Sequence, residues 1–123
     1  MSYIKKFFTS VSHASRGLRY IFVHEQNFRL QVIATLVLIV VVWFLPLKPS
    51  EMIVLLCLAL FVLVLEIINS AMEKFIDMLK PRLSYQAGII KDMLAGMVLI
   101  AGALSLLIAG MILIPTVFEL IAK

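Results

Sequence analysis

Charge is scarce in this sequence, and so is cysteine. Only 15% of the 123 residues are charged, while 63% are hydrophobic and the mean hydropathy is +1.13. Soluble proteins carry nearer a quarter of charged residues, so the composition excludes an ordinary soluble domain. The single cysteine, Cys57, excludes a disulfide framework and a cysteine-rich zinc site. We therefore expect one integral membrane domain, residues 1–123.

Several familiar sequence signals are also missing. Residues 1–24 have neither the continuous apolar core nor the small-residue cleavage site of a signal peptide. The chain has no P-loop and no glycine-rich kinase loop. Its aromatic residues do not interleave with a basic patch, so we expect no nucleic-acid partner. Any nucleotide site in this protein must be of an unusual kind.

Three apolar runs predict transmembrane helices at residues 30–47, 51–72 and 93–114. The uncharged part of the second run, Met52 to Leu65, covers roughly 21 Å at 1.5 Å per residue, less than the ~30 Å of a hydrocarbon core. The helix must therefore continue through Glu66, which places that carboxylate at or just inside the hydrocarbon edge.

Proline and serine residues predict where these helices begin and end. Ser50 and Ser84 are candidate N-caps of the second and third spans. Pro81 predicts the end of the second helix, with a short polar linker reaching to Gly88, and Pro115 predicts the exit of the third. The predicted fold is all-α.

Residues 1–24 predict an amphipathic helix, with a bend at Gly17. Its apolar face comprises Ile4, Phe7, Phe8, Val11, Leu18, Ile21 and Phe22, and its polar face comprises Lys5, Lys6, Ser12, Arg16 and Arg19. Such a helix can lie in a membrane interface with its basic side chains towards anionic headgroups, or it can pack on the protein's own spans. Both roles can hold together.

The basic residues predict the orientation. With three spans, nine of them share one side, and only Lys48 and Lys123 fall on the other. The nine are Lys5, Lys6, Arg16, Arg19, Arg29, Lys74, Lys80, Arg82 and Lys91. The positive-inside rule then places the N-terminus and the second loop in the cytoplasm.

Polar residues line one face of the second helix where it leaves the membrane. At about 100° per residue, Glu66, Asn69, Glu73 and Asp77 fall within an arc of roughly 80°. Ionisable groups at this depth are costly and are usually functional. A solvated helix end, whose charges only keep it out of the lipid, is the alternative.

Carboxylates and lysine at a cytosolic membrane surface suit a Mg²⁺-nucleotide site. Mg²⁺ is commonly held by one or two carboxylates together with phosphate oxygens. Phosphoryl transfer further needs a base to take the acceptor's proton, and a carboxylate at the hydrocarbon edge can reach a lipid hydroxyl. A proton-coupled transporter or channel that uses Glu66 and Glu73 as a relay is the alternative. A relay needs acidic residues at successive depths of the bilayer, and no acidic residue lies in the middle of any predicted span here.

Two long motifs resemble the signature of the prokaryotic diacylglycerol kinase family, which includes undecaprenol kinases. They are Glu66-x-x-Asn69-Ser-Ala-x-Glu73-x-x-x-Asp77 and Lys91-Asp92-x-x-Ala95-Gly96. Upstream, Arg16-Gly-Leu-Arg19 and Glu25-x-Asn27-Phe28-Arg29 resemble the family's N-terminal pattern, and the similarity covers nearly the whole chain.

The resemblance implies a homotrimeric bundle in the bacterial inner or plasma membrane, with cytoplasmic active sites shared between protomers. It implies phosphorylation of a membrane lipid alcohol by ATP with Mg²⁺. By matching position, Glu66 would be the general base, and Glu25 and Glu73 would ligate the metal and bind nucleotide. Asn69, Lys91 and Asp92 would also hold the nucleotide.

The resemblance leaves the roles of several other positions open. His13 falls where some members place an aromatic near the adenine, although a histidine on a polar helix face needs no such role. Asp77 is either linked to the metal or paired with a neighbouring lysine. Gln31 and Ser84 replace an acidic residue and a histidine found in some diacylglycerol kinases. The Asn27-Phe28-Arg29 variant looks more like undecaprenol kinases, so undecaprenol is the favoured lipid.

Overall fold

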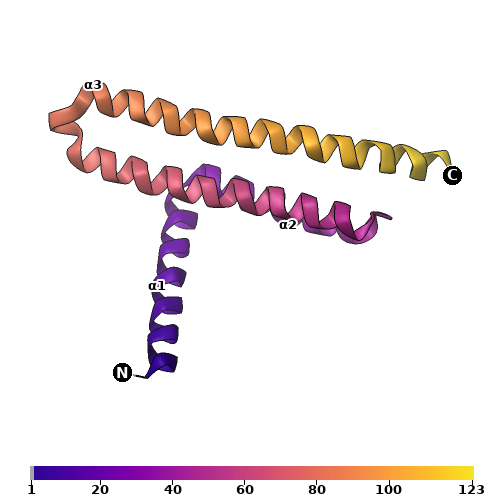
Figure 1. The fold of residues 1–123 in the computed structure, drawn as a ribbon, viewed down its shortest axis with the longest axis horizontal. Coiled ribbons are helices and arrows are strands. Elements are labelled where there is room, and N and C mark those ends of the chain that lie inside the picture. Colours follow the sequence, from indigo (N-terminus) through magenta and orange to yellow (C-terminus); the bar gives the residue numbers. More distant parts are fainter. Residues whose placement is uncertain (1) are drawn as a thin grey trace.

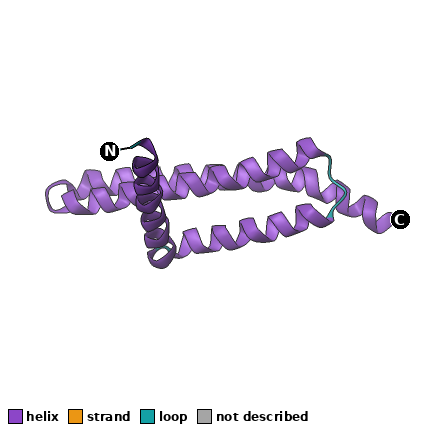
Figure 2. Ribbon diagram, turned by 90° about the horizontal axis from the view of Figure 1, so that it is seen from below, coloured by secondary structure: helices purple, strands orange, loops and turns teal. Residues whose placement is uncertain are grey.

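A computed structural model describes residues 2–123, apart from the side chains of residues 80–84. The described chain forms three helices, α1 (Tyr3–His24), α2 (Gln26–Phe44) and α3 (Pro49–Ala122). Helix α3 folds back on itself, so its first arm, Pro49–Leu79, and its second arm, Tyr85–Ala122, lie side by side (Figures 1 and 2). Helix α2 and both arms are long and apolar enough to cross a membrane. The predicted all-α fold with three spans is confirmed.

A single residue, Glu25, turns the chain from α1 into α2. Its backbone is extended, with φ −113° and ψ 109°. Arg29 stabilises this corner, because its Nη1 donates hydrogen bonds to the carbonyl oxygens of Phe22 (2.8 Å) and Val23 (2.7 Å). These carbonyls lie at a helix end, where intrahelical donors are lacking. As a result, α1 projects sideways from the spans (Figure 1).

Helix α1 begins at a serine cap and runs uninterrupted to the corner. The Ser2 hydroxyl accepts a hydrogen bond from the backbone N–H of Lys5 at 3.3 Å. The helix is continuous from Tyr3 to His24 and its ribbon is straight in Figure 1, so the predicted bend at Gly17 does not form. A helical glycine costs about 1 kcal/mol relative to alanine but keeps every backbone hydrogen bond. The side chains of Phe7 and Phe8 are exposed, as an interfacial helix requires.

The turn between α2 and α3 differs from the sequence prediction. Helix α2 ends at Phe44, so residues 45–47 of the first predicted span are not helical. Helix α3 begins at Pro49 with Lys48 as its N-cap, and the prediction of Ser50 was wrong. Proline suits the first helical position because its φ is fixed and the N–H it lacks would have no partner there. The Glu51 carboxylate accepts a hydrogen bond from the Lys48 backbone N–H at 3.0 Å, which completes the cap.

The second arm of α3 is longer than the predicted span at both ends. It is helical from Tyr85, so the linker expected to reach Gly88 is shorter. The predicted helix end at Pro81 and cap at Ser84 fall among residues 80–84, outside the fully described residues. The helix also passes through Pro115 to Ala122, against expectation. In an apolar environment exposed backbone groups are so costly that a helix continues past a proline.

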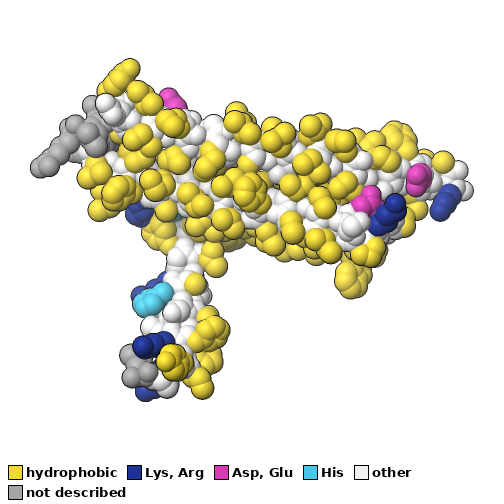
Figure 3. All heavy atoms as spheres, viewed as in Figure 1, with side chains coloured by type: hydrophobic (Ala, Val, Ile, Leu, Met, Phe, Trp, Pro, Cys, Tyr) yellow, Lys and Arg dark blue, Asp and Glu magenta, His cyan; other side chains and the backbone are white. Residues whose placement is uncertain are grey.

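Packing between the spans is concentrated at the end away from α1. Val42 of α2, Leu47 of the turn and Leu55 of the first arm form a buried cluster, and Ala109 and Leu113 of the second arm pack against it. Most other apolar side chains of the spans are exposed and cover the face seen in Figure 3. This surface is suited to lipid tails or to further copies of the chain. The most buried polar residues, Glu66 and Asn69, lie at the opposite end, towards α1.

Candidate active site

Glu66 is the most deeply buried charged residue of the described chain. Its side chain and backbone together are 2% exposed, and those of Asn69, one turn further along α3, are 8% exposed. The Gln31 amide on α2 donates a hydrogen bond from Nε2 to Glu66 Oε2 at 3.4 Å. Burial of a carboxylate is unfavourable unless hydrogen-bond donors reach it. Glu66, on the first arm of α3, therefore faces α2, which supplies its donor.

An acid-lined groove of about 960 Å³ lies between α1 and the first arm of α3. We call it the α1–α3 groove. Its carboxylates are those of Glu25, at the α1–α2 corner, and of Glu73 and Asp77, one turn apart on α3. The groove wall on α1 includes Ala14, whose side chain is a methyl group, and Gly17, which has no side chain, so the wall is open there. Glu25 thus faces the same cavity as Glu73 and Asp77, although it is far from them in sequence.

Two lysines border these carboxylates. Lys91, on the second arm, forms an ion pair with Asp77. Lys74 lies on the first arm with its Nζ 3.8 Å from the centre of the Tyr20 ring, and Tyr20 stacks on His24 with ring centroids 4.0 Å apart. This cation–π contact links the end of α1 to α3. The groove thus has both the anionic groups that hold a divalent cation and the cationic groups that attract phosphate.

The carboxylates of the groove fit a nucleotide-bound Mg²⁺ better than a site made by protein ligands alone. Within the described residues, no three histidine, cysteine or acidic side chains gather closely enough for a ready-made metal site. Mg²⁺ needs only one or two carboxylates when phosphate oxygens and water complete its octahedron. Glu25 and Glu73 supply that number from two elements.

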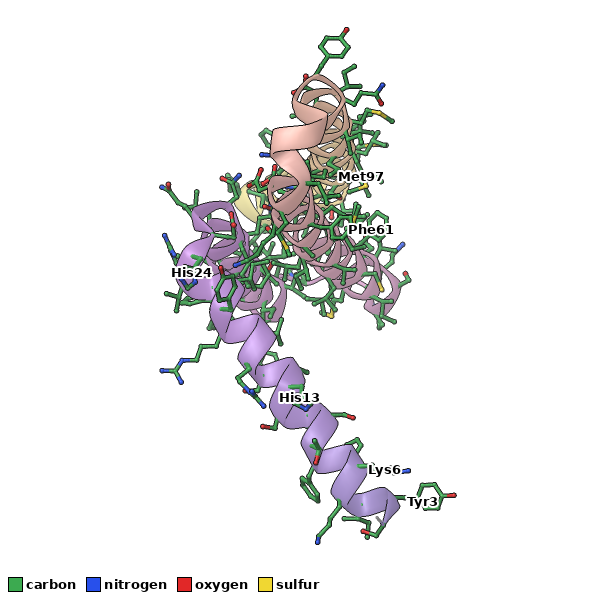
Figure 4. All side chains as sticks on the ribbon, turned by 90° about the vertical axis from the view of Figure 1, so that its left-hand side faces the viewer. Tyr3, Lys6, His13, His24, Phe61 and Met97 are labelled. Atoms are coloured by element: carbon green, nitrogen blue, oxygen red, sulfur yellow. The ribbon has the colours of Figure 1, made fainter. Side chains whose placement is uncertain are left out.

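The other predicted residues differ in their relation to the groove. Asn69 is buried beside Glu66, and Lys91 reaches the groove through Asp77. Asp92 is exposed and is not among the described residues that line the groove. His13 is also exposed, and Figure 4 shows it part-way along α1, away from the spans. Its Nδ1 lies 3.1 Å from Arg16 Nη2, on the same helix.

Sequence reasoning missed two contacts of the site. The Tyr20–Lys74 contact depends on how α1 docks, for which the sequence carries no signal. For the Gln31–Glu66 contact the sequence does carry a signal, because Gln31 and Thr35 are polar side chains in the otherwise apolar run of residues 30–47. A polar residue within a span usually faces the protein interior.

The fold and the site together define an all-helical membrane protein with a buried carboxylate beside an acid-lined groove at one end of its spans. The family model of prokaryotic diacylglycerol kinase matches residues 12–113. The diacylglycerol kinase of Escherichia coli strain K12 is 29% identical over 92 residues, which are 75% of each chain. That of Synechocystis is 29% identical over 113 residues, 91% of this chain and 65% of the relative.

The chain belongs to the prokaryotic diacylglycerol kinase family. It is a lipid kinase of bacterial membranes, and kinase membership implies ATP as the phosphate donor. This membership decides against the proton-relay alternative.

Proposed function

We propose that this lipid kinase transfers the γ-phosphoryl group of ATP, with Mg²⁺, to the hydroxyl of a membrane lipid alcohol at the cytosolic surface. The observation that carries the proposal is the position of buried Glu66 next to the α1–α3 groove. Glu66 precedes Ile67 and lies about one turn before Ser70 on α3, and both of these residues line the groove, so a group bound in the groove lies close to Glu66.

Different residues of the site take the lipid proton and hold the metal. Glu66 takes the proton of the lipid hydroxyl as its oxygen attacks the γ-phosphorus, and the bond from phosphorus to the ADP oxygen breaks. Glu25 and Glu73 would hold Mg²⁺, which neutralises charge on the phosphates. Lys91 is a point charge suited to a phosphate oxygen. Asn69, His13 and Asp92 belong to the proposed nucleotide site by resemblance.

The depth of the residues supports this division. Glu73 lies two turns beyond Glu66, about 10 Å along the helix axis. A lipid hydroxyl at the hydrocarbon edge therefore meets Glu66, while the nucleotide stays on the cytosolic side. Because α1 projects sideways from the spans (Figure 1), it lies along the membrane surface when the spans cross the bilayer. Its basic face then meets the headgroups.

We also propose that the active enzyme is a homotrimer with shared active sites. The spans of one chain leave most of their apolar surface exposed. His13 and Asp92 are not among the described residues that line the groove of their own chain, and a trimer would allow them to act on the groove of a neighbouring copy. Sharing therefore accounts for site residues that one chain does not bring together.

The acceptor is diacylglycerol or undecaprenol. The bacterial relatives named above are diacylglycerol kinases, whereas the Asn27-Phe28-Arg29 sequence resembles undecaprenol kinases. In this structure Phe28 is buried and Arg29 stabilises the α1–α2 corner. Through this corner, Phe28 and Arg29 can influence lipid choice by fixing the position of Glu25.

The purified protein in mixed micelles, with radiolabelled ATP and either lipid, tests the proposal. We expect a labelled lipid phosphate, formed only when Mg²⁺ is present. Omitting the lipid controls for ATP hydrolysis, and comparing kcat/KM for the two lipids identifies the preferred acceptor. Labelling of neither lipid at any Mg²⁺ concentration contradicts the proposal.

A further inference from the structure

A polar side chain at position 31 is unfavourable if only the stability of the fold is considered. It lines an apolar groove of about 410 Å³ between α2 and both arms of α3, beside Ala34, Leu58 and Val62. Its amide oxygen, Oε1, is buried and has no hydrogen-bond partner. A leucine of similar size would avoid the cost of the unpaired Oε1, but it would leave the buried Glu66 carboxylate without this donor. The benefit of Gln31 must therefore lie in the one bond that it makes.

That bond joins Gln31 to Glu66. The amide Nε2 donates to Glu66 Oε2 at 3.4 Å, and buried Asn69 lies one turn further along the same helix. The charged groups whose fields reach Glu66 are Glu25, at the α1–α2 corner, and Glu73, on its own helix. Both are negative, so Gln31 brings a neutral donor to a carboxylate whose other charged neighbours are acidic.

We propose that Gln31 is a positioning residue, which orients the Glu66 carboxylate towards the lipid hydroxyl and keeps it available as a base. This inference rests on the proposed function, because it assigns Gln31 a role in that reaction. A glutamate at position 31 would place a second carboxylate beside Glu66. Two carboxylates at such a distance share a proton, so the free base would form at higher pH than in the unaltered enzyme.

Three variants separate positioning from a structural role. Gln31→Leu removes the donor and should lower kcat about 10-fold, the effect of losing one hydrogen bond to a charged group, with the KM for ATP within about twofold. The Tm of this variant should change little, because removal of the unpaired Oε1 offsets the loss of the donor to Glu66. Gln31→Glu keeps the size of the side chain and should shift the acid limb of the pH–kcat profile about one unit or more to higher pH. Thr35→Val is the matched control, one turn along the same face, because the Thr35 hydroxyl bonds only its own helix backbone.

The outcomes are distinct. A lower kcat for Gln31→Leu at unchanged Tm, with the shifted profile of Gln31→Glu, supports the inference. If Gln31→Leu matches Thr35→Val in kcat, or if Gln31→Glu keeps the original pH profile, the inference is wrong while the proposed function stands. A decrease in Tm that parallels the loss of kcat would assign Gln31 a structural role. If the unaltered enzyme phosphorylates no lipid, the proposed function and this inference both fail.

Discussion

Asp77 and Lys91 form an ion pair that joins the two arms of α3. Asp77 also lines the α1–α3 groove, so this pair holds the Lys91 ammonium at the edge of the proposed nucleotide site. Of the two roles considered for Asp77 from the sequence, pairing with a lysine is the one that the structure shows. The pair is partly exposed, with side chains 29% (Lys91) and 53% (Asp77) accessible, so we expect it to add little to stability.

The first prediction concerns the role of Lys91. Lys91→Met should raise the KM for ATP about 10-fold, because a charged contact to phosphate is lost. Asp77→Asn is the control, since it removes the ion pair but keeps the ammonium, and it should change this KM by less than about threefold. Steady-state kinetics over a range of ATP concentrations measure both values. An equal increase in the two variants would mean that the pair itself, rather than a phosphate contact, is what matters.

The second prediction concerns topology. In a Cys57→Ser background, a cysteine at Tyr85, which is exposed at the start of the second arm, should react with an impermeant maleimide only from the cytoplasmic side. A cysteine at Lys48, in the α2–α3 turn, should react only from outside. Labelling of intact cells and of inverted vesicles distinguishes the two sides. The opposite pattern would separate the site from cytosolic ATP.

The third prediction concerns assembly. Glu66→Gln and Asp92→Asn should each be inactive when expressed alone and should regain activity when they are co-expressed, because a shared site can draw an intact residue from each chain. Cross-linking in detergent should give species up to the trimer. Each variant expressed alone is the control. A monomeric fraction with full specific activity would show that the sites are not shared.

The fourth prediction concerns the metal. Glu73→Gln and Glu25→Gln should each raise the Mg²⁺ concentration for half-maximal activity about 10-fold or more, so that high Mg²⁺ restores part of the rate. Glu51→Gln is the matched control, since that carboxylate caps α3 at the other end of the spans. Activity titrated with Mg²⁺ at constant free ATP provides the measurement. Equal curves for Glu73→Gln and Glu51→Gln would remove Glu73 from the metal site.

The elements that face lipid are the ones that the sequence predicts well. Apolar runs indicate the spans because the bilayer imposes both their length and their helical structure. The stripe from Glu66 to Asp77 follows from helical periodicity alone, and the structure buries its first two members, Glu66 and Asn69. Local rules of capping were less reliable, because Pro49 and Glu51 together favour an earlier helix start than Ser50 does.

Contacts between elements could not be read from the sequence. The sharp corner at Glu25 depends on the reach of Arg29 back to α1, and this corner decides which face of α1 meets Glu73. The Gln31–Glu66 bond depends on the relative rotation of α2 and α3. Pro115 was misjudged because the rule for helix ends comes from water-exposed helices, whereas apolar surroundings preserve the helix.

The most direct test of the account is the kinetic comparison of Glu66→Gln with Glu73→Gln at several Mg²⁺ concentrations. Glutamine keeps the size and hydrogen bonding of Glu66 but cannot accept the proton. We predict that kcat and kcat/KM of Glu66→Gln fall together by about 10²–10⁴-fold, that MgATP still binds, and that added Mg²⁺ restores nothing. Glu73→Gln should instead recover with Mg²⁺. If Glu66→Gln keeps near-normal turnover, or if Mg²⁺ rescues it and not Glu73→Gln, Glu66 is not the base.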